Sequence, residues 1–514
     1  MTASRTSLSI KNAKVAFLFY LVTGILNFVS RKIFIDHLGA EVLGLNATAT
    51  NLLNFLNIAE LGIGIAISYA LYAPLATKDN ETISEIVSVQ GYWYRKIGFI
   101  ILAASLITMC FFPVFFAKMH LPLWYAYACF VALLASSLFS YFWNYRQIVL
   151  SADQKQYKIT TILQGWKGIK IILQILAVIY LRNGFIYWVL LEFITSVLQT
   201  ISLNYRINKE YPWLKASPSK GKMLQKKYPE IITKTKQLFF HKIGSLVLTQ
   251  TSPLILYAFT TLTLVAMYDN YLIVIIGITA LLNSIFTSIG ASVGNLVAQG
   301  DKKLIDNIFW ELFSIRFLLV STICIGVYWM AQPFITLWVG SQYLLDNTSL
   351  LLLVLIMYIN LMRTVVDSFI SAYGLFEDVW ATLTEAALNL GLSILLGYYY
   401  GIHGILTGAL ISLIVIIFIW KPWFCYHRGF KKPISSYLSG YLTHALVFAG
   451  VLSPILFLSK VLFPTTSLPT WQVLIHGFVA TVIYFVAAAI ALNFVSKGMR
   501  QFRNRISLVF RSAK

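Results

Sequence analysis

Residues 158–205 read KITTILQGWKGIKIILQILAVIYLRNGFIYWVLLEFITSVLQTISLNY. This stretch contains two apolar runs, and each is at least as long as the roughly 20 residues that a helix needs to cross a bilayer. Only Arg182 and Asn183 separate the two runs, and so short a connection forces the two helices to be antiparallel neighbours. The stretch therefore predicts a helical hairpin that crosses a membrane twice.

The rest of the chain has the same character. Of the 514 residues, 58% are hydrophobic and 11% are charged, whereas soluble domains average about 25% charged residues. Some 298 apolar residues, obtained as about 58% of the chain, are enough for about fourteen spans. We therefore predict an all-α polytopic membrane protein with about 14 transmembrane helices, and we exclude a soluble enzyme, a disordered chain and a disulfide scaffold. The predicted spans are 15–35, 43–74, 92–117, 122–146, 158–181, 184–205, 237–259, 267–292, 307–331, 348–373, 378–399, 402–424, 437–463 and 471–494.

Basic residues are distributed unequally between the predicted loops. With the N-terminus in the cytoplasm, the inner segments and the helix ends that flank them hold 31 of the 40 Lys and Arg residues, and the outer segments hold three. The positive-inside rule then places both termini in the cytoplasm. The net charge of +21 is explained by basic loops that face anionic membrane lipid, and no nucleic acid is expected as a partner.

Polar segments divide the chain into regions. Nine Lys and Arg residues occur in the longest polar segment, which we interpret as a solvated linker on the lipid surface. The last residues place Arg among apolar residues at helical spacing, a pattern typical of an amphipathic helix on the inner leaflet. The predicted regions are an N-terminal lobe (1–205, helices 1–6), a basic cytoplasmic linker (206–236), a C-terminal lobe (237–424, helices 7–12), helices 13 and 14 (425–494) and a basic amphipathic tail (495–514).

Once the basic residues at the helix ends are counted with the flanking loops, six remain inside the predicted spans, where a charge costs roughly 2.5–3.5 kcal/mol on insertion scales. Lys167 and Arg316 each lie nine residues into a span, about 14 Å deep at about 1.5 Å per residue. Such groups face either a wet cavity or a charged partner, and two cations on one helix face favour an anion such as pyrophosphate. The candidate anion-binding residues are Lys167, Lys170, Arg316, Arg31, Lys32 and Arg363.

Ion pairing is the alternative for the basic residues of the first six spans. Lys167 and Lys170 share a helix face, and Glu60 or Glu192 from neighbouring spans could neutralise them. Two further cations lie at the outer end of the first span, where snorkelling to the interface explains them as well as a cavity does; these are Arg31 and Lys32.

The later spans offer similar alternatives. Asp367 follows Arg363 by four residues, a spacing that favours an ion pair within the helix. Glu311 precedes Arg316 by five residues, which is a looser match.

Acidic residues inside the spans are candidates for ion coupling. Glu60 and Glu385 could carry a proton or hold a cation, with hydrogen bonds between packed helices as the alternative, and Asp269 is a third candidate. No nucleotide-binding GxxxxGK[ST] motif occurs, so H⁺ or Na⁺ is the possible coupling ion. The four cysteines show no CxxC spacing, and no metal or other cofactor is expected.

Several short motifs, in this order along the chain, resemble those of a known family. They are RKIFI (31–35), LGAE (38–41), LGLN (43–46), AELGIG (59–64), LYAPL (71–75), HKIG (241–244), YDNY (268–271), ASVGN (291–295) and EAALNL (385–390). Over about residues 12–430 the chain resembles the polysaccharide transporter (Wzx-type oligosaccharide flippase) family of the multidrug/oligosaccharidyl-lipid/polysaccharide exporter superfamily. One departure is TQTSP at 249–253, where multidrug relatives often carry an acid, so coupling here is expected to differ.

The resemblance implies two six-helix lobes in a V plus two extra C-terminal helices. It implies a transporter rather than an enzyme: a flippase that carries a polyprenyl-pyrophosphate-linked oligosaccharide from the inner to the outer leaflet of the bacterial inner membrane. Surface polysaccharides such as lipopolysaccharide would be the product, with a polysaccharide polymerase and other biosynthetic membrane proteins as partners. The alternatives are a cation-coupled multidrug exporter and a membrane glycosyltransferase or polymerase, although the short outer loops disfavour the latter.

Overall fold

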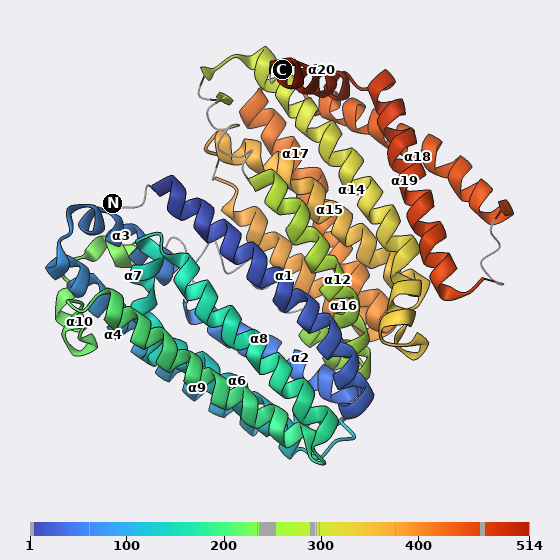
Figure 1. Ribbon diagram of the computed structural model, residues 1–514. Helices are drawn as coiled ribbons and strands as arrows, with labels where there is room; N and C mark the ends of the chain where they lie inside the picture. The colour runs from blue at the N-terminus through green and yellow to red at the C-terminus, as the bar shows by residue number, and fades with distance from the viewer. Residues whose placement is uncertain are drawn as a thin grey trace. The chain divides into compact units, whose positions relative to one another are not determined.

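The computed structural model describes residues 5–60, 62–233, 253–287, 299–375, 377–462 and 468–512, together with the isolated positions 235, 293, 296 and 297. Within these residues all regular elements are helices (Figure 1), which confirms the predicted all-α class. Eleven of the described helical stretches are long and apolar enough to cross a membrane, so the chain is a multi-pass membrane protein. It divides into an N-terminal unit, Met1–Ala266, and a C-terminal unit, Met267–Lys514.

The described elements of the N-terminal unit are long helices joined by short turns. They are α1 (Arg5–Leu38), α2 (Ala40–Leu56), the 3₁₀ turn η1 (Asn57–Glu60), α3 (Ile63–Thr77), α4 (Asn80–Cys110), α5 (Phe112–Phe115), α6 (Trp124–Phe142), the 3₁₀ turn η2 (Asn144–Arg146), α7 (Gln147–Ala152), α8 (Gln156–Tyr180), α9 (Gly184–Glu210) and α10 (Pro218–Leu224).

The C-terminal unit is built in the same way, and its first helix starts a few residues before the unit boundary. The described elements are α12 (Leu262–Thr287), α14 (Lys302–Trp338), the 3₁₀ turn η3 (Ser341–Tyr343), α15 (Asn347–Ala372), α16 (Val379–Leu413), the π-helix η4 (Ile414–Trp420), α17 (Lys421–Phe424), the π-helix η5 (Cys425–Phe430), α18 (Ile434–Leu462), α19 (Thr470–Val495) and α20 (Lys497–Ser512).

One predicted span is wrong as a continuous helix. The sequence predicts a single helix over 43–74, but α2 ends at Leu56 and α3 begins only at Ile63. Between them lie a 3₁₀ turn and Gly62, whose φ of 96° is left-handed and ends regular helix geometry. The break places Asn57 and Glu60 on an irregular turn inside an otherwise apolar segment.

Two other predicted spans meet at the expected place. Residues 378–399 and 402–424 are predicted as separate helices, and Gly401 interrupts α16 with a φ of 56° and a ψ of −132°. The predicted span 237–259 lies mostly outside the described residues, and its described end, 253–259, is helical.

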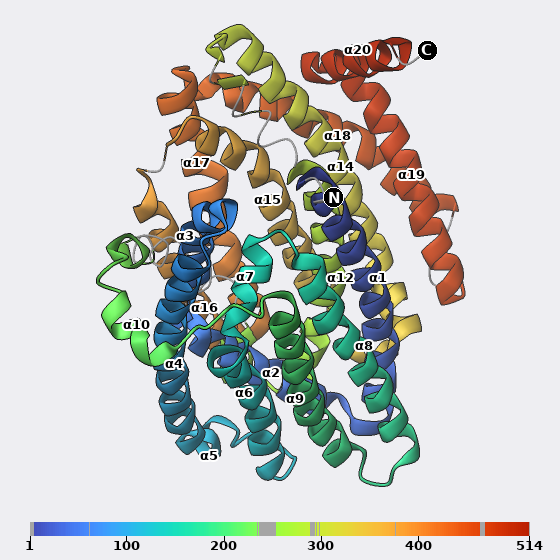
Figure 2. The same ribbon diagram turned by 60° about the vertical axis from the view of Figure 1, so that its left-hand side comes forward.

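Helix α8 is the centre of one face of the N-terminal unit. It packs against α1 on one side and against α9 on the other, as both views show (Figures 1 and 2). Two glycines of α8 face α1: a Cβ atom at Gly165 would be in ordinary van der Waals contact with Phe19 at 3.9 Å, and one at Gly168 with Leu26 at 3.7 Å. The contacts of α8 with α1 and α9 fix the positions of Lys167 and Lys170 relative to these two helices.

The predicted cytoplasmic linker is more ordered than the sequence predicts. Helix α10 packs along α4, and a Cβ atom at Gly221 would lie only 2.4 Å from the backbone oxygen of Ser88. The backbone N–H of Ser217 donates to Ser88 Oγ at 2.9 Å, and Lys227 pairs with Glu85 at 2.6 Å. This part of the linker is therefore docked on α4 rather than fully solvated.

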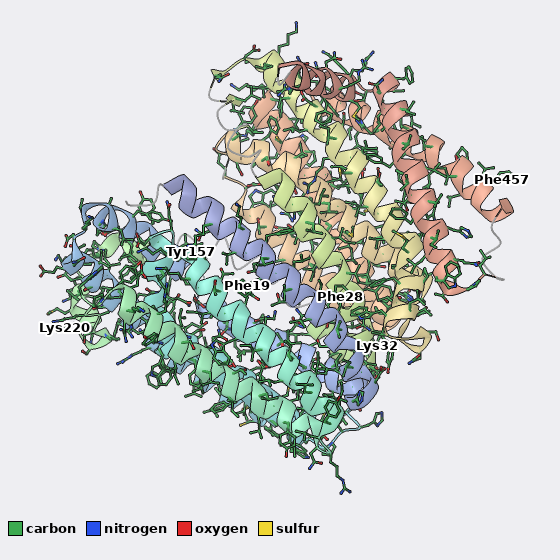
Figure 3. All side chains as sticks on the ribbon, in the orientation of Figure 1. Phe19, Phe28, Lys32, Tyr157, Lys220 and Phe457 are labelled. Carbon is green, nitrogen blue, oxygen red and sulfur yellow. The ribbon has the colours of Figure 1, made fainter. Side chains whose placement is uncertain are left out.

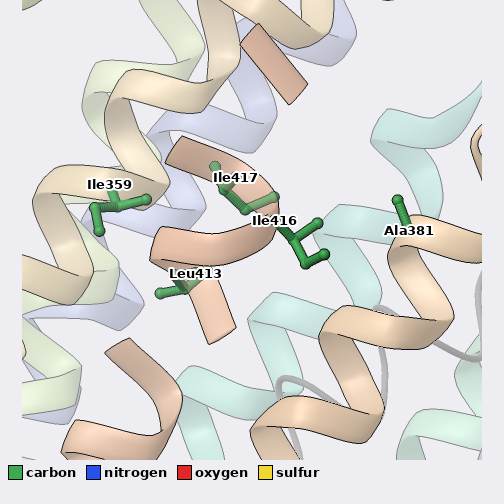
Figure 4. Packing of buried hydrophobic residues seen from close by; sticks show 5 residues of the cluster. All are labelled: Ile359, Ala381, Leu413, Ile416 and Ile417. Atoms are coloured by element: carbon green, nitrogen blue, oxygen red, sulfur yellow. The ribbon is translucent and has the colours of Figure 1, made fainter. Parts of the chain in front are cut away.

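Helix α14 forms the core of the C-terminal unit and contacts α15, α19 and α20. A second apolar cluster joins α15, α16 and η4, and Figure 4 shows its buried members. They are Ile359, Ala381, Leu413, Ile416 and Ile417. These contacts hold α15 and α16 side by side, and these two helices carry Arg363, Asp367 and Glu385.

Candidate functional site

Two lysines, three residues apart on α8, have different surroundings. Lys170 Nζ donates to Glu192 Oε1 on α9 at 2.6 Å, and Glu192 is buried. Gln174 Nε2 donates to the other carboxylate oxygen at 3.3 Å and to the carbonyl of Trp188 at 3.0 Å. Lys170 thus has the carboxylate partner that the sequence offers as an alternative.

Lys167 stands one turn earlier on α8 and is exposed. Among the described residues no carboxylate lies within ion-pair distance of its ammonium group. A lysine without an acid, on a helix that crosses a membrane, needs water or an anion to solvate its charge. Lys167 is therefore the α8 cation that is available to a ligand.

The other two candidate cations of this unit lie near the C-terminal end of α1. Arg31 Nη2 donates to the carbonyl of Ala266 at 3.1 Å. Lys32 Nζ lies 3.6 Å from Asp36 Oδ2, and both side chains are about half exposed. Figure 3 shows Lys32 towards one end of α1, with Phe19 further along the helix. Both basic residues therefore have local oxygen partners.

The break between α2 and α3 places a half-buried carboxylate, that of Glu60, between two helices. Tyr94 donates its hydroxyl to Glu60 Oε1 at 2.7 Å, and Tyr141 donates to Glu60 Oε2 at 2.9 Å. The hydroxyl of Tyr141 also lies 3.2 Å from Asn57 Oδ1. Both tyrosines are buried, so two hydroxyl groups from α4 and α6 enclose the carboxylate.

No cation lies within ion-pair distance of Glu60 among the described residues. A carboxylate that contacts only neutral donors keeps a negative charge that a small cation could balance. Ion coupling by Glu60 stays a prediction. Sequence reasoning missed Tyr94 and Tyr141, because nothing distinguishes them locally among the 29 tyrosines of the chain.

Arg316 lies wholly inside the C-terminal unit, with no exposed surface. Its Nε donates to the carbonyl of Leu361 at 2.9 Å, and its Nη2 donates to Asn283 Oδ1 at 2.7 Å and Thr364 Oγ1 at 3.1 Å. Glu311, the carboxylate considered from the sequence, instead pairs with a residue of α20. Anion binding by Arg316 would require it to leave these neutral oxygens.

Arg363 belongs to a network of two cations and two carboxylates. Its Nε donates to Asp367 Oδ2 at 2.9 Å, the pair that the spacing predicts, and its Nη1 lies 3.8 Å from Glu385 Oε1. Lys421 donates to the other oxygen of Asp367 at 2.6 Å. The four charges balance. The sequence signal for Lys421 was its position within the apolar run that begins at Ile411.

The third acidic candidate, Asp269, is half-buried on α12 beside the fully buried Asn270. Within the described residues no cluster of three His, Cys, Asp or Glu side chains is arranged to hold a metal ion. Of the three acidic candidates, Glu60 and Glu385 are the ones whose contacts are described above.

The C-terminal unit also contains an apolar cavity of about 480 Å³ between α14, α15 and α18. Its wall includes six aromatic side chains: Phe317, Tyr328, Trp329, Tyr358, Tyr441 and Phe448. Cavities of this size and composition accommodate hydrocarbon or ring systems rather than ions.

No protein-family model and no curated protein sequence matches the chain. Solved structures do. The inward closed conformation of the lipid II flippase MurJ matches with a TM-score of 0.65 and 15% identity, covering 93% of this chain and 99% of that one. The inward-facing conformation of a multidrug resistance MATE family transporter of the MOP superfamily matches with a TM-score of 0.60 and 13% identity, over 80% of this chain and 98% of that one. The chain therefore has the fold that these transport proteins share.

Proposed function

From this shared fold we propose that the chain is a flippase that moves a polyprenyl-pyrophosphate-linked oligosaccharide from the inner to the outer leaflet by alternating access. The observation that carries the proposal is Lys167, an exposed lysine on a membrane-crossing helix without a carboxylate partner among the described residues. A pyrophosphate group carries the negative charge that would neutralise this ammonium group. The structural likeness to a lipid II flippase supports the same substrate class.

The remaining parts of such a substrate also have counterparts. Arg31, Lys32 and Lys170 belong to the same unit as Lys167, and in this proposal they contact the substrate after exchanging their present oxygen partners for its phosphates. The apolar cavity between α14, α15 and α18 suits a hydrocarbon chain. In this proposal the protein works in the bacterial inner membrane with both termini in the cytoplasm. The oligosaccharide that it transports is then used by a polysaccharide polymerase and other biosynthetic membrane proteins.

A second candidate function is a cation-coupled multidrug exporter. Glu60 favours it, because a half-buried carboxylate that contacts only neutral donors among the described residues could serve as a site for the coupling ion. The likeness to a MATE transporter points in the same direction. The two candidates differ in the charge of the substrate, so one assay can separate them.

The test is a flipping assay in liposomes that contain the purified protein and a fluorescent lipid-linked oligosaccharide. We expect the wild-type protein to expose the labelled lipid to an external quencher. Lys167→Ala should slow this at least about tenfold, since a charged hydrogen bond is worth roughly 1.5–3 kcal/mol, while Lys167→Arg should retain activity. Arg182→Gln removes an exposed cation from the α8–α9 connection and should have no effect.

The same liposomes decide between the candidates. A protein that leaves the labelled lipid in place but accumulates a fluorescent organic cation under a proton gradient is an exporter, and the flippase proposal then fails. Flipping by Lys167→Ala at the wild-type rate would remove the proposed anion site.

A further inference from the structure

The C-terminal helix α20 is built onto the C-terminal unit by specific contacts. Ser496, in an extended conformation with a φ of −89° and a ψ of 123°, ends α19 and redirects the chain. Helix α20 then runs across the ends of α14 and α19 (Figures 1 and 2). It packs closely on α14, so its orientation is fixed by protein contacts.

One face of α20 is adapted to α14. A Cβ atom at Gly498 would lie 2.1 Å from the carbonyl oxygen of Trp310, so only glycine allows the observed approach. Arg505 lies two turns later on the same face, and its Nε pairs with Glu311 Oε1 at 3.1 Å. The Glu311 side chain is 6% exposed and that of Arg505 is 56% exposed, so the arginine reaches inward to a buried carboxylate.

A buried polar cluster anchors the start of the helix. Ser496 Oγ lies 2.8 Å from Ser314 Oγ on α14, and Ser314 Oγ lies 2.9 Å from His444 Nε2 on α18. All three side chains are buried. The first turn of α20 is therefore tied to two other helices of the unit.

Another face of α20 has no such partners. Lys497, Arg500 and Arg503 are exposed, and among the described residues none of them is within ion-pair distance of an acid. Their spacing of three residues turns by about 60° at each step, so the three charges form one stripe. The helix contains no Asp or Glu. Three cations are thus held together on a surface where no acid of the described part of the chain pairs with them.

We propose that this stripe of Lys497, Arg500 and Arg503 binds the phosphate headgroups of anionic phospholipids. The helix continues directly from a membrane-crossing helix, which keeps the stripe close to the bilayer surface. Gly498 and Arg505 face α14, so the protein contacts and the lipid contacts use different faces of the helix. A membrane rich in anionic lipid therefore stabilises the junction of α14, α19 and α20, and a neutral membrane does not.

The test is hydrogen–deuterium exchange of residues 497–512 in the full-length protein, in nanodiscs of phosphatidylcholine alone or with phosphatidylglycerol. We expect slower exchange in the anionic discs. Each basic residue near an anionic surface should slow exchange about fivefold. The double variant Arg500→Gln, Arg503→Gln should therefore reduce the difference in exchange rate between the two kinds of disc by about 25-fold. Exchange in the neutral discs should not change.

Two further variants complete the test. Lys220→Gln with Lys222→Gln removes two exposed charges from α10 and should leave the exchange of α20 unchanged. Glu311→Gln weakens the contact with α14 and should speed exchange in both kinds of disc, which separates docking from lipid binding. Equal exchange of the wild-type helix in both discs would overturn the proposal, as would protection that requires an added acidic polypeptide instead of lipid.

Discussion

The two units differ in the partners that they provide for charged residues within the predicted spans. In the C-terminal unit, Arg363 belongs to a balanced network with carboxylates, and Arg316 is enclosed by neutral oxygens with no exposed surface. In the N-terminal unit, Lys167 lacks an acid and Glu60 lacks a cation among the described residues. The difference teaches that depth in the membrane alone does not identify a functional charge. It is more informative to ask whether the charged group already has an ion-pair or hydrogen-bond partner within the protein.

The largest expected effect is on the stability of the C-terminal unit. Arg316→Ala removes a large buried side chain together with the donor to Asn283 and Thr364, and we expect it to lower the free energy of unfolding by about 4 kcal/mol. Arg316→Met fills most of the space without a charge and should cost much less, since apolar replacement of buried charges is often near neutral. Denaturant unfolding in detergent measures both. If Arg316→Met folds normally but cannot flip the labelled lipid, Arg316 binds substrate and the contrast between the units disappears.

The next effect separates two lysines of the same helix. Lys167→Met should slow flipping by about 10- to 100-fold without changing the unfolding midpoint, because no intramolecular pair is lost. Lys170→Met leaves Glu192 buried without its cation and should lower the free energy of unfolding by about 3 kcal/mol. The control is the double variant Lys170→Met, Glu192→Gln, which should restore stability. Equal destabilisation by both single variants would show that Lys167 also has a structural partner.

A third test compares the carboxylates. Glu60→Gln loses no ion pair among the described residues, so we expect a stable protein whose flipping no longer responds to a proton or sodium gradient. Glu385→Gln removes a buried charge 3.8 Å from Arg363 and should lower the free energy of unfolding by about 3 kcal/mol while the gradient response remains. Flipping is measured with and without each gradient. The reverse pattern would move ion coupling to the C-terminal unit.

The smallest effect is a pH dependence at the helix caps. Asp346 caps α15 by accepting hydrogen bonds from the backbone N–H groups of Thr348 and Ser349 at 3.0 and 3.1 Å. Burial alone would raise the pKa of Asp346, but hydrogen bonds from Ser349 and His403 outweigh it and lower the pKa to about 2. A depressed carboxyl pKa adds stability above the unfolded value near 4, and that stability is lost as the pH falls towards about 2.

Because the Asp346 side chain is about half exposed, solvent screening limits the effect to about 1 kcal/mol. Asp346→Asn should remove this part of the acid dependence, measured as the unfolding midpoint between pH 5 and pH 2. In the N-terminal unit, hydrogen bonds from Thr82 likewise lower the pKa of Asp79, the cap of α4, and Asp79→Asn serves as the matched comparison. An unchanged pH profile in Asp346→Asn would contradict the assignment.

Hydropathy predicts the long helices well and their interruptions poorly. The hairpin predicted over 158–205 is present as α8 and α9, with its turn at the predicted residues. The glycine break at Gly401 also occurs where a short connection is expected. The break at Asn57 was missed, because apolar residues continue on both sides and only backbone geometry around Gly62 reveals it.

The surroundings of the candidate site residues were predictable only where a partner is charged. Glu192 was available from the sequence as a partner for Lys170, because few acids occur in the neighbouring spans. The hydroxyl groups around Glu60 and the carbonyl and amide oxygens around Arg316 were not. Neutral hydrogen-bonding groups are too common along the chain for their position to indicate a contact, so these arrangements depend on the packing of helices distant in sequence.

The docking of α10 on α4 has a practical consequence for measuring motion. Because Gly221 and Ser217 fix this short helix to α4, a spectroscopic label at Lys220 would follow the N-terminal unit as part of the same body. Cys110 is exposed, and the other three cysteines are buried. Replacing Cys110 and introducing Lys220→Cys would therefore provide one accessible thiol, from which the movements of that unit during a transport cycle can be followed in single molecules.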